Sequence, residues 1–341
     1  MKWLLLSLAL AACGNKKTGP VEPPAHDAAK ADRLLPMSDA PAAVVLPPAP
    51  PLPPVPAGLP PLDNLPSPEA VALGELLFWD PRLSASGVTA CAGCHDPQHG
   101  YAGGRTDTAG GKPNLRAAST LVNVAWKKQL GWDGRYDDLA AYLPIHARGQ
   151  LGDELATVLA RIADVPLYKA HLARVPSLAD ALAGYVRTRY AGDAPWDRVE
   201  RSPDLPADLK AGYQLFGGKA QCSVCHPPPL YTDLAYHRLG LIAVPDEGRG
   251  KVDPAQKGAF ATPTLRGAAA RASFFHDGSA HTLGEAIDWH LAGGTGQGAD
   301  RSIIDPALKK VALTPAERSQ LGAFVRALTA PDAVAVKPVL P

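Results

Sequence analysis

The sequence predicts a mainly helical fold made of two similar domains in tandem. Three segments occur twice, and in the same order, along the 341 residues. In each half a Gly-x-x-Leu-Phe segment comes first, a Cys-x-x-Cys-His motif follows, and an amphipathic stretch that contains an aromatic residue followed by Val and Arg comes last. The two cysteine motifs start at positions 91 and 222, so each domain has roughly 130 residues. A chain that is 46% hydrophobic can bury a core in each.

The repeated cysteine motif is a haem attachment pattern. Each copy has two cysteines and a histidine: Cys91, Cys94 and His95, then Cys222, Cys225 and His226. Two thiols spaced in this way add to the vinyl groups of a porphyrin, and the imidazole that follows them ligates the iron. The sequence therefore predicts two covalently bound haem c groups. A zinc site built from the four thiolates is the competing interpretation, and it leaves both adjacent histidines without a role.

The N-terminus has the pattern of a bacterial lipoprotein signal. Lys2 precedes an apolar run that is too short to span a bilayer. The run ends in Leu-Ala-Ala-Cys, which resembles a lipobox, and Cys13 is the one cysteine of five outside the haem motifs. We expect a signal peptide at residues 1–12 and a lipid anchor at Cys13, which would hold the protein on the periplasmic side of the cell envelope. An ordinary signal peptide that contains a cysteine is the alternative.

Residues 13–67 are rich in proline and alanine. Prolines remove backbone donors and favour extended conformations, so we expect a disordered tether that contributes to no core and no catalysis. The folded part is expected to begin with a helix at Ser67-Pro68-Glu69. We assign an N-terminal domain to residues 68–203 and a C-terminal domain to residues 204–335. The division falls where Ser-Pro-Asp-Leu-Pro breaks the helical pattern.

Paired helices are expected to frame each domain. The segments 177–190 and 314–329 are amphipathic and contain the matching sequences Ala-Gly-Tyr-Val-Arg and Gly-Ala-Phe-Val-Arg. Small residues allow two helices to cross closely, with the aromatic ring packed across the crossing. The first and last helices of class I cytochromes c meet in this way. The predicted fold is therefore two class I cytochrome c-like haem domains preceded by a proline-rich tether.

The second iron has one candidate sixth ligand. The only two methionines, Met1 and Met37, lie outside the predicted domains, which excludes the usual methionine ligand. His290 falls in the last turn of a helix predicted from about Thr282 to the paired glycines at 293–294. We therefore predict that His290 ligates the iron attached at His226. A histidine on a solvated helix face is the alternative.

The first iron has no comparable candidate. His99 lies only four residues beyond His95, too near to reach the opposite face of the haem, and no histidine occurs between His99 and His146. We infer a five-coordinate or water-bound iron at His95. Such an iron can react with a small molecule as well as transfer electrons.

The region from 73 to 329 resembles the bacterial di-haem cytochrome c peroxidase superfamily, which includes di-haem enzymes that oxidise protein tryptophans. The matching stretches are 73–84, 94–97, 121–124, 132–135, 260–266 and 274–279. The resemblance implies that the haem at His95 reacts with peroxide and that the haem at His226 accepts and stores electrons. Trp132, in Trp-Asp-Gly-Arg, matches the tryptophan that couples the two haems. His290 stands where relatives have methionine or tyrosine, which would make a bis-histidine haem.

One departure from the family concerns catalysis. Alignment on Pro144-Ile145 places Gln150 where the peroxidases have a glutamate that moves a proton during O–O cleavage. An amide donates and accepts hydrogen bonds but is no base near neutral pH. His146, with an ordinary pKa of about 6.5, would substitute if it faces the iron. An exposed loop histidine is the alternative for His146.

Other departures concern calcium and activation. The side-chain asparagine of the family's calcium site is matched by Ala117, and the position of a threonine by Arg271, which argues against bound calcium. Relatives that need reduction before they become active carry a histidine in the loop after the first haem motif. This chain has a glycine-rich segment at 109–111 there. Our hypothesis is that the first haem is open without a reductive switch.

The predicted function is a di-haem c-type cytochrome peroxidase. It would reduce hydrogen peroxide with electrons from a small periplasmic donor, a cytochrome c or a copper protein. Two alternatives stay open: oxidation of a partner protein's tryptophan by a two-haem high-valent state, and a non-catalytic di-haem electron carrier. With 34 basic and 33 acidic residues the chain has no excess of positive charge that would attract nucleic acid. The resemblance also suggests a homodimer.

Overall fold

The computed structural model describes residues 44–330 and 336–341, and this part of the chain is mainly helical, as predicted. The α-helices are α1 (Pro68–Trp79), α2 (Cys91–Cys94), α3 (Leu139–Leu151), α4 (Leu155–Ile162), α5 (Pro166–Leu172), α6 (Leu178–Arg187), α7 (Pro195–Val199), α8 (Ala207–Gly217), α9 (Leu283–Leu291) and α10 (Pro315–Ala327). Short 3-10 helices occur at Pro81–Leu83, Pro97–His99, Val124–Trp126, Cys222–Val224, Gly248–Lys251, Pro254–Gln256, Ala268–Ala270 and Arg301–Ile303. The predicted signal peptide and the anchor at Cys13 lie outside the described residues. Within those residues, no helix has the length and apolar character to cross a bilayer.

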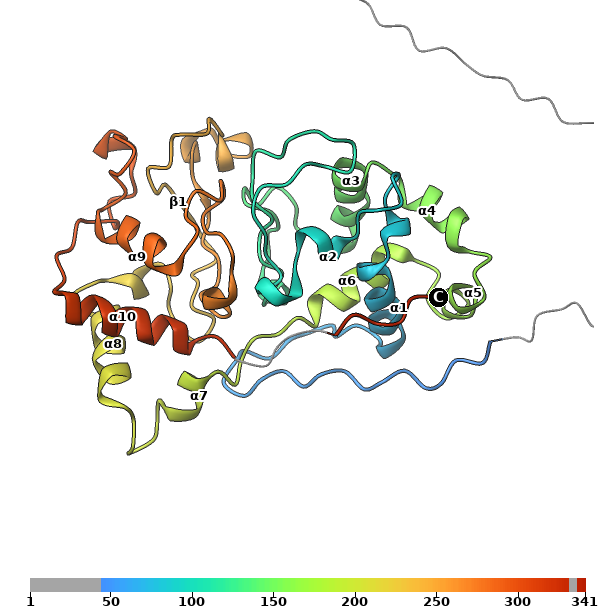
Figure 1. Ribbon diagram of the computed structural model, residues 1–341, viewed down its shortest axis with the longest axis horizontal. Helices are drawn as coiled ribbons and strands as arrows, with labels where there is room; N and C mark the ends of the chain where they lie inside the picture. Colours follow the sequence, from blue (N-terminus) through green and yellow to red (C-terminus); the bar gives the residue numbers. More distant parts are fainter. Residues whose placement is uncertain (1–43, 331–335) are drawn as a thin grey trace, which may run out of the picture. The chain divides into compact units, whose positions relative to one another are not determined.

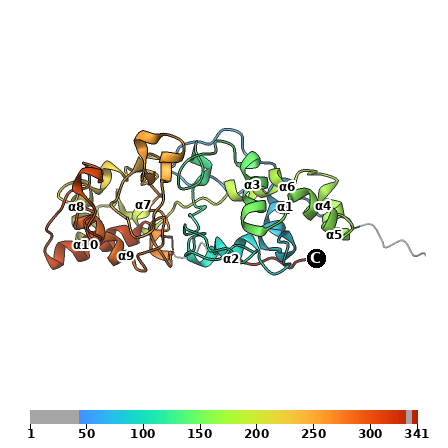
Figure 2. The same ribbon diagram turned by 90° about the horizontal axis from the view of Figure 1, so that it is seen from above.

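Each half of the described chain is framed by two helices that lie side by side (Figures 1 and 2). Helix α1 crosses α6 at Gly74, where a Cβ atom would overlap a backbone carbonyl of α6 and the Cβ of Tyr185. Helix α8 crosses α10 at Gly212, where a Cβ atom would overlap a backbone carbonyl of α10 and the Cβ of Phe324. Only glycine permits so close an approach. The close crossings expected from the repeated segments therefore occur in both halves.

Local capping signals determine where these helices begin. The hydroxyl of Ser67 accepts a hydrogen bond at 3.1 Å from a backbone N–H in the first turn of α1, which confirms the predicted start. Thr314 and Glu317 cap α10 reciprocally. Thr282 caps α9, and His290 lies in the last turn of this helix, as predicted.

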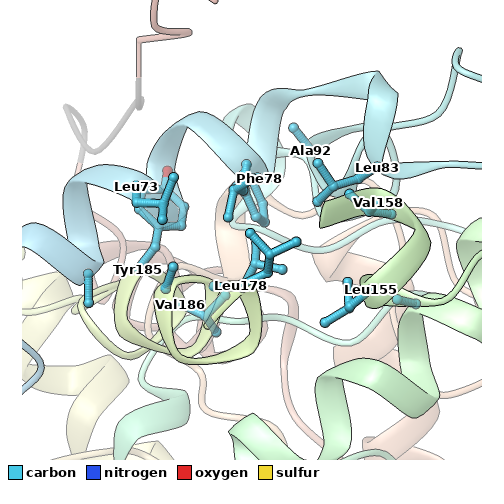
Figure 3. Close-up of a cluster of buried hydrophobic side chains, with 14 of the residues drawn as sticks. Leu73, Phe78, Leu83, Ala92, Leu155, Val158, Leu178, Tyr185 and Val186 are labelled. Carbon is cyan, nitrogen blue, oxygen red and sulfur yellow. The ribbon is translucent and has the colours of Figure 1, made fainter. Parts of the chain in front are cut away.

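Figure 3 shows the buried core of the first half. Leu73 and Phe78 of α1 face α6, where the ring of Tyr185 lies 5.1 Å from that of Phe78. Leu155 and Val158 of α4 complete the cluster. Burial of these apolar side chains holds the three helices together, at about 25 cal/mol for each Å² removed from water.

A separate buried cluster fills the second half. The ring of Phe324 in α10 lies 5.0 Å from Phe216 of α8 and 4.8 Å from Trp196 of α7. An ion pair of 2.7 Å between Asp197 and Arg266 also ties α7 to this half. Helix α7 precedes the predicted domain boundary at 203–204, yet it packs in the second core. The boundary itself stays a prediction.

Loops of the two halves are joined by hydrogen bonds and an ion pair, beside a short strand pair of the second half. Strands β1 (Tyr236–His237) and β2 (Phe260–Ala261) run antiparallel in the second half. The N–H of Ala261 donates to the carbonyl of Trp132 at 2.8 Å, and the N–H of Ala117 donates to the carbonyl of His276 at 2.7 Å. Arg116 adds an ion pair of 2.5 Å to Asp246. These contacts hold the loop of Trp132 against the second half.

The described part of the proline-rich segment, residues 44–67, contains no helix or strand (Figure 1). The indole N–H of Trp126 donates to the carbonyl of Pro60 at 3.1 Å, and Leu46 is buried. Extended proline-rich backbone leaves carbonyls free to accept such bonds. This part of the segment therefore packs on the protein, unlike the tether without core contacts that the composition suggested.

Candidate haem-binding sites

The first attachment motif forms a single helical turn. Helix α2 contains both cysteines, and the backbone N–H of His95 donates to the carbonyl of Cys91 at 2.8 Å. The Nδ1 atom of His95 lies 3.0 Å from the carbonyl oxygen of Ser119 and 3.3 Å from that of Tyr101. Because a carbonyl only accepts hydrogen bonds, Nδ1 carries the proton and Nε2 keeps its lone pair for a metal.

The second attachment motif has the same arrangement. The N–H of His226 donates to the carbonyl of Cys222 at 2.9 Å. Its Nδ1 lies 3.0 Å from the carbonyl oxygen of Tyr231, so Nε2 is again free. In both motifs, one turn of backbone thus presents two thiols and one metal-binding imidazole nitrogen.

His290 borders the same cavity as His226, Cys222 and Cys225. Its Nδ1 donates to the carbonyl of Ala286 one turn earlier, at 2.7 Å, which leaves Nε2 without that bond. The ring of Phe275 lies 5.8 Å from the ring of His290. This arrangement suits a sixth ligand in apolar surroundings, and the ligand role of His290 stays a prediction.

His146 lies opposite His95. It projects from α3, and the two ring centres are 6.1 Å apart. The hydroxyl of Tyr142 lies 3.1 Å from Nδ1 of His146, one turn earlier on the same helix. Burial, and then the neighbouring His95, lowers the pKa of His146 to about 4, so the imidazole is neutral near pH 7. The sequence left His146 as a proton carrier or an exposed loop histidine, whereas the structure places it half-buried on α3. Its position beside His95 argues against the predicted open iron.

Polar side chains lie on the face of α3 that carries His146. Tyr142, His146 and Gln150 are spaced four residues apart and therefore share one face of α3. The amide of Asn114 donates to the side-chain oxygen of Gln150 at 2.8 Å. Sequence reasoning missed Tyr142 and Asn114. The helical spacing would have found Tyr142, whereas nothing local connects Asn114 to a residue 36 positions away.

Trp132 lies in the wall of the cavity that His226 and His290 border. Its indole N–H donates to the carbonyl of Ala117 at 2.8 Å, and its ring lies 6.5 Å from that of His276. Trp132 belongs to the first half of the chain and borders the site of the second. This position is compatible with the predicted coupling role, which stays a prediction.

The cavity beside the second motif fits an attached haem. Apolar side chains form most of its lining, and the imidazoles and thiols of the motif open into it. The buried Nε atom of Arg271, also in this wall, has no hydrogen-bond partner. Among the described residues the four motif cysteines do not come together in one metal-binding group, so they offer zinc no four-thiolate site. The residues present therefore favour haem over zinc.

One further group of potential metal ligands occurs among the described residues: Cys225, Asp233 and His237. Both ring nitrogens of His237 are already bonded, to Asp233 at 2.8 Å and to Asp305 at 2.7 Å. Since Cys225 belongs to the attachment motif, this group is not an independent metal site.

Two attachment motifs with free imidazole nitrogens, one in each helical half, define a di-haem c-type cytochrome. A family model described as di-haem cytochrome c peroxidase, CCP_MauG, matches residues 68–204. The chain is also 36% identical over 294 residues to the methylamine utilization protein MauG of Methylorubrum extorquens, covering 81% of this chain and 82% of that protein. The chain therefore belongs to the di-haem cytochrome c peroxidase and MauG family, which confirms the resemblance seen in the sequence.

Other relatives agree with this membership. The chain is 33% identical to cytochrome-c peroxidase IdrP1 of Denitromonas iodatirespirans, over 79% of this chain and 84% of that protein. Among solved structures, a MauG-like protein associated with microbial copper homeostasis superposes with a TM-score of 0.70 at 26% identity, covering 85% of this chain and 96% of that one. The family comprises oxidoreductases that carry haem c.

Proposed function

We propose that this protein reduces hydrogen peroxide at the site of His95, with electrons delivered through the site of His226. The haem at His95 would supply the iron that reacts with peroxide, and the haem at His226 would store the electrons. A small cytochrome c or a copper protein is the proposed donor. Membership of a family of di-haem oxidoreductases supports this assignment.

The observation that carries the proposal is the contrast between the two distal sides. Beside His146 lies the phenol hydroxyl of Tyr142, and one turn further along the same face of α3 the amide of Gln150 accepts a hydrogen bond from Asn114. Beside His290 lies the ring of Phe275. A polar side with hydrogen-bond donors suits activation of peroxide, whereas an apolar closed side suits electron transfer.

His146 is the proposed proton carrier. Its imidazole is neutral near pH 7, because burial lowers its pKa to about 4, and its Nε2 is free to accept a proton. The amide of Gln150 cannot do this, but it can orient a bound oxygen atom. At a ring separation of 6.1 Å, His146 must move aside before peroxide can reach the metal.

A turnover assay tests this function. Holoprotein, hydrogen peroxide and a reduced small cytochrome c are mixed, and oxidation of the donor is followed by its absorbance. Sustained oxidation that depends on both peroxide and the holoprotein supports the proposal. Peroxide-dependent modification of a tryptophan in a co-expressed partner, without donor turnover, would support the tryptophan-oxidising alternative. Absence of both reactions would refute peroxide chemistry.

A non-catalytic electron carrier is the second candidate, and the His95–His146 pair favours it. Two imidazoles 6.1 Å apart can saturate one iron between them, as carriers do. Low-temperature EPR of the oxidised holoprotein, with and without cyanide, separates the two. Two low-spin signals that change on addition of neither cyanide nor peroxide indicate an electron carrier. A signal that changes on addition of peroxide indicates the peroxidase.

We also propose that the protein is anchored by a lipid at Cys13 on the periplasmic side of the envelope and forms a homodimer. The apolar run before Leu-Ala-Ala-Cys supports the anchor. Mass spectrometry of the mature N-terminus measures the lipid, and replacement of Cys13 with alanine should release the protein from the membrane fraction. Light scattering of the purified holoprotein measures the assembly.

A further inference from the structure

Arg271 is a buried cation without an acidic partner among the described residues. Its Nη2 donates to the carbonyl oxygens of Thr264 at 2.6 Å and Arg266 at 3.3 Å. Its Nε is buried without a hydrogen-bond partner. Burial alone lowers the pKa of Arg271 to about 10, so no carboxylate of the described chain offsets the cost of its charge.

A second cation lies near it on the other half of the chain. Lys127 follows the 3-10 helix Val124–Trp126 and lines a small cavity together with Thr264. Burial, and then the charge of Arg271, lowers the pKa of Lys127 to about 8. Two desolvated like charges repel, and this arrangement is stable when an anion lies beside them. No side chain described here supplies that anion.

The cavity beside the second haem motif indicates which anion would lie beside Arg271. Arg271 lines this cavity together with His226 and His290. The imidazole of His237, also in the wall, is held by two aspartates, and Lys309 is exposed. Arg271 is therefore a cation in the cavity wall that has no acidic partner among the described residues. A haem that fills the cavity brings two propionate carboxylates, which are ionised at neutral pH.

We propose that Arg271 is the binding site for a propionate carboxylate of the haem attached at Cys222 and Cys225. The Nε–H of Arg271 has no hydrogen-bond partner, and a guanidinium can donate to both oxygens of a carboxylate through a fork of two N–H groups. The two backbone carbonyls accept from Nη2 and hold the side chain in place.

The site also sets the potential of this haem. A ferric haem carries one more positive charge than a ferrous haem, so a nearby cation favours the reduced form. Arg271 and the iron ligand His226 line the same cavity, so the charge of Arg271 lies close to this haem. Loss of this cation should lower the midpoint potential of the second haem.

The test is a redox titration of holoprotein variants with optical detection. Arg271→Gln removes the charge at similar size, Arg271→Lys keeps the charge without the fork, and Lys309→Gln removes a charge from the exposed edge of the same cavity. His290→Met changes the predicted ligand of the second haem, so the redox transition that this variant shifts is assigned to that haem. We expect Arg271→Gln to shift the oxidation equilibrium of this haem at least tenfold, or 59 mV for one electron, toward lower potential. Lys309→Gln should leave it near the wild-type value.

Resonance Raman spectra of the propionate bending modes give an independent readout. Arg271→Gln and Arg271→Lys should both shift this band, because both lose the bidentate contact. An unchanged band and potential in Arg271→Gln with full haem content would overturn the proposal, as would an equal shift in Lys309→Gln. If Arg271→Gln fails to fold, an unchanged band in Arg271→Lys overturns it. The inference rests on a haem at His226, and not on peroxidase activity, so either can fail alone.

Discussion

Replacement of His146 with alanine removes the imidazole that lies opposite His95. Two metal–imidazole bonds of about 2 Å each, plus the distance from each nitrogen to its ring centre, place two such centres roughly 6 Å apart. The observed separation is 6.1 Å. We therefore expect His146 to ligate the first iron in the resting oxidised protein, and the alanine variant to convert that iron from low spin to high spin.

In the alanine variant, cyanide binding should become tighter while peroxide turnover becomes slower. If His146 of the wild-type protein leaves the iron only about 1% of the time, the apparent cyanide affinity of the wild type is about 100-fold weaker than that of an open iron. The alanine variant should therefore bind cyanide about 100-fold more tightly than the wild type. Peroxide turnover should nevertheless fall by about 10²–10⁴, because the variant loses its proton carrier. A residue with a merely structural role would not produce this opposed pattern.

The assays are low-temperature EPR, cyanide titration and steady-state oxidation of a reduced donor. His99→Ala is the matched control, since His99 follows the same motif but is exposed and bonds to Asp96 at 2.7 Å. A wild-type first haem that is already high spin, together with unchanged cyanide affinity in His146→Ala, would refute the reasoning. Unchanged turnover would refute the proton-carrier role.

Three further predictions concern the rest of the molecule. Trp132→Phe keeps an aromatic ring but loses the indole donor, and should slow electron transfer between the haems in stopped-flow absorbance; equal rates would contradict the coupling role. Gly212→Ala should destabilise the fold by about 1–3 kcal/mol in chemical unfolding, because its Cβ would overlap α10. Gly217→Ala on the same helix, with no neighbour closer than 3.9 Å, should be near neutral. Burial opposes ionisation of Asp246, but hydrogen bonds, first from Arg116, outweigh it and lower its pKa from 3.8 to about 2. This stabilisation, on the order of 2 kcal/mol, is complete above about pH 4 and lost as the pH falls toward 2. Thermal unfolding of Asp246→Asn should therefore show lower stability at neutral pH and a weaker decline in acid, and an acid profile equal to wild type would count against the pair.

The sequence by itself determined those features whose physical cause is local. Attachment of haem needs two thiols and an imidazole within five residues, so the motifs at Cys91 and Cys222 could be read directly. The start of α1 follows from the Ser67 cap, and the placement of His290 follows from helical period and terminal glycines. The small residues of the repeated segments 183–187 and 322–326 also predicted two close helix pairs. The structure places close approaches of these pairs at Gly74 and Gly212.

Only the tertiary structure decided which distant residues meet. His95 and His146 belong to separate helices, and they face each other because the packing of α1, α6 and α3 orients both. The unpartnered charge of Arg271 could not be seen in the sequence, since it depends on which carboxylates the fold leaves out of reach. Local propensities act over a few residues, whereas burial and charge pairing act across the whole fold. For that reason the sequence located both haems, and the fold decided what lies on their distal sides.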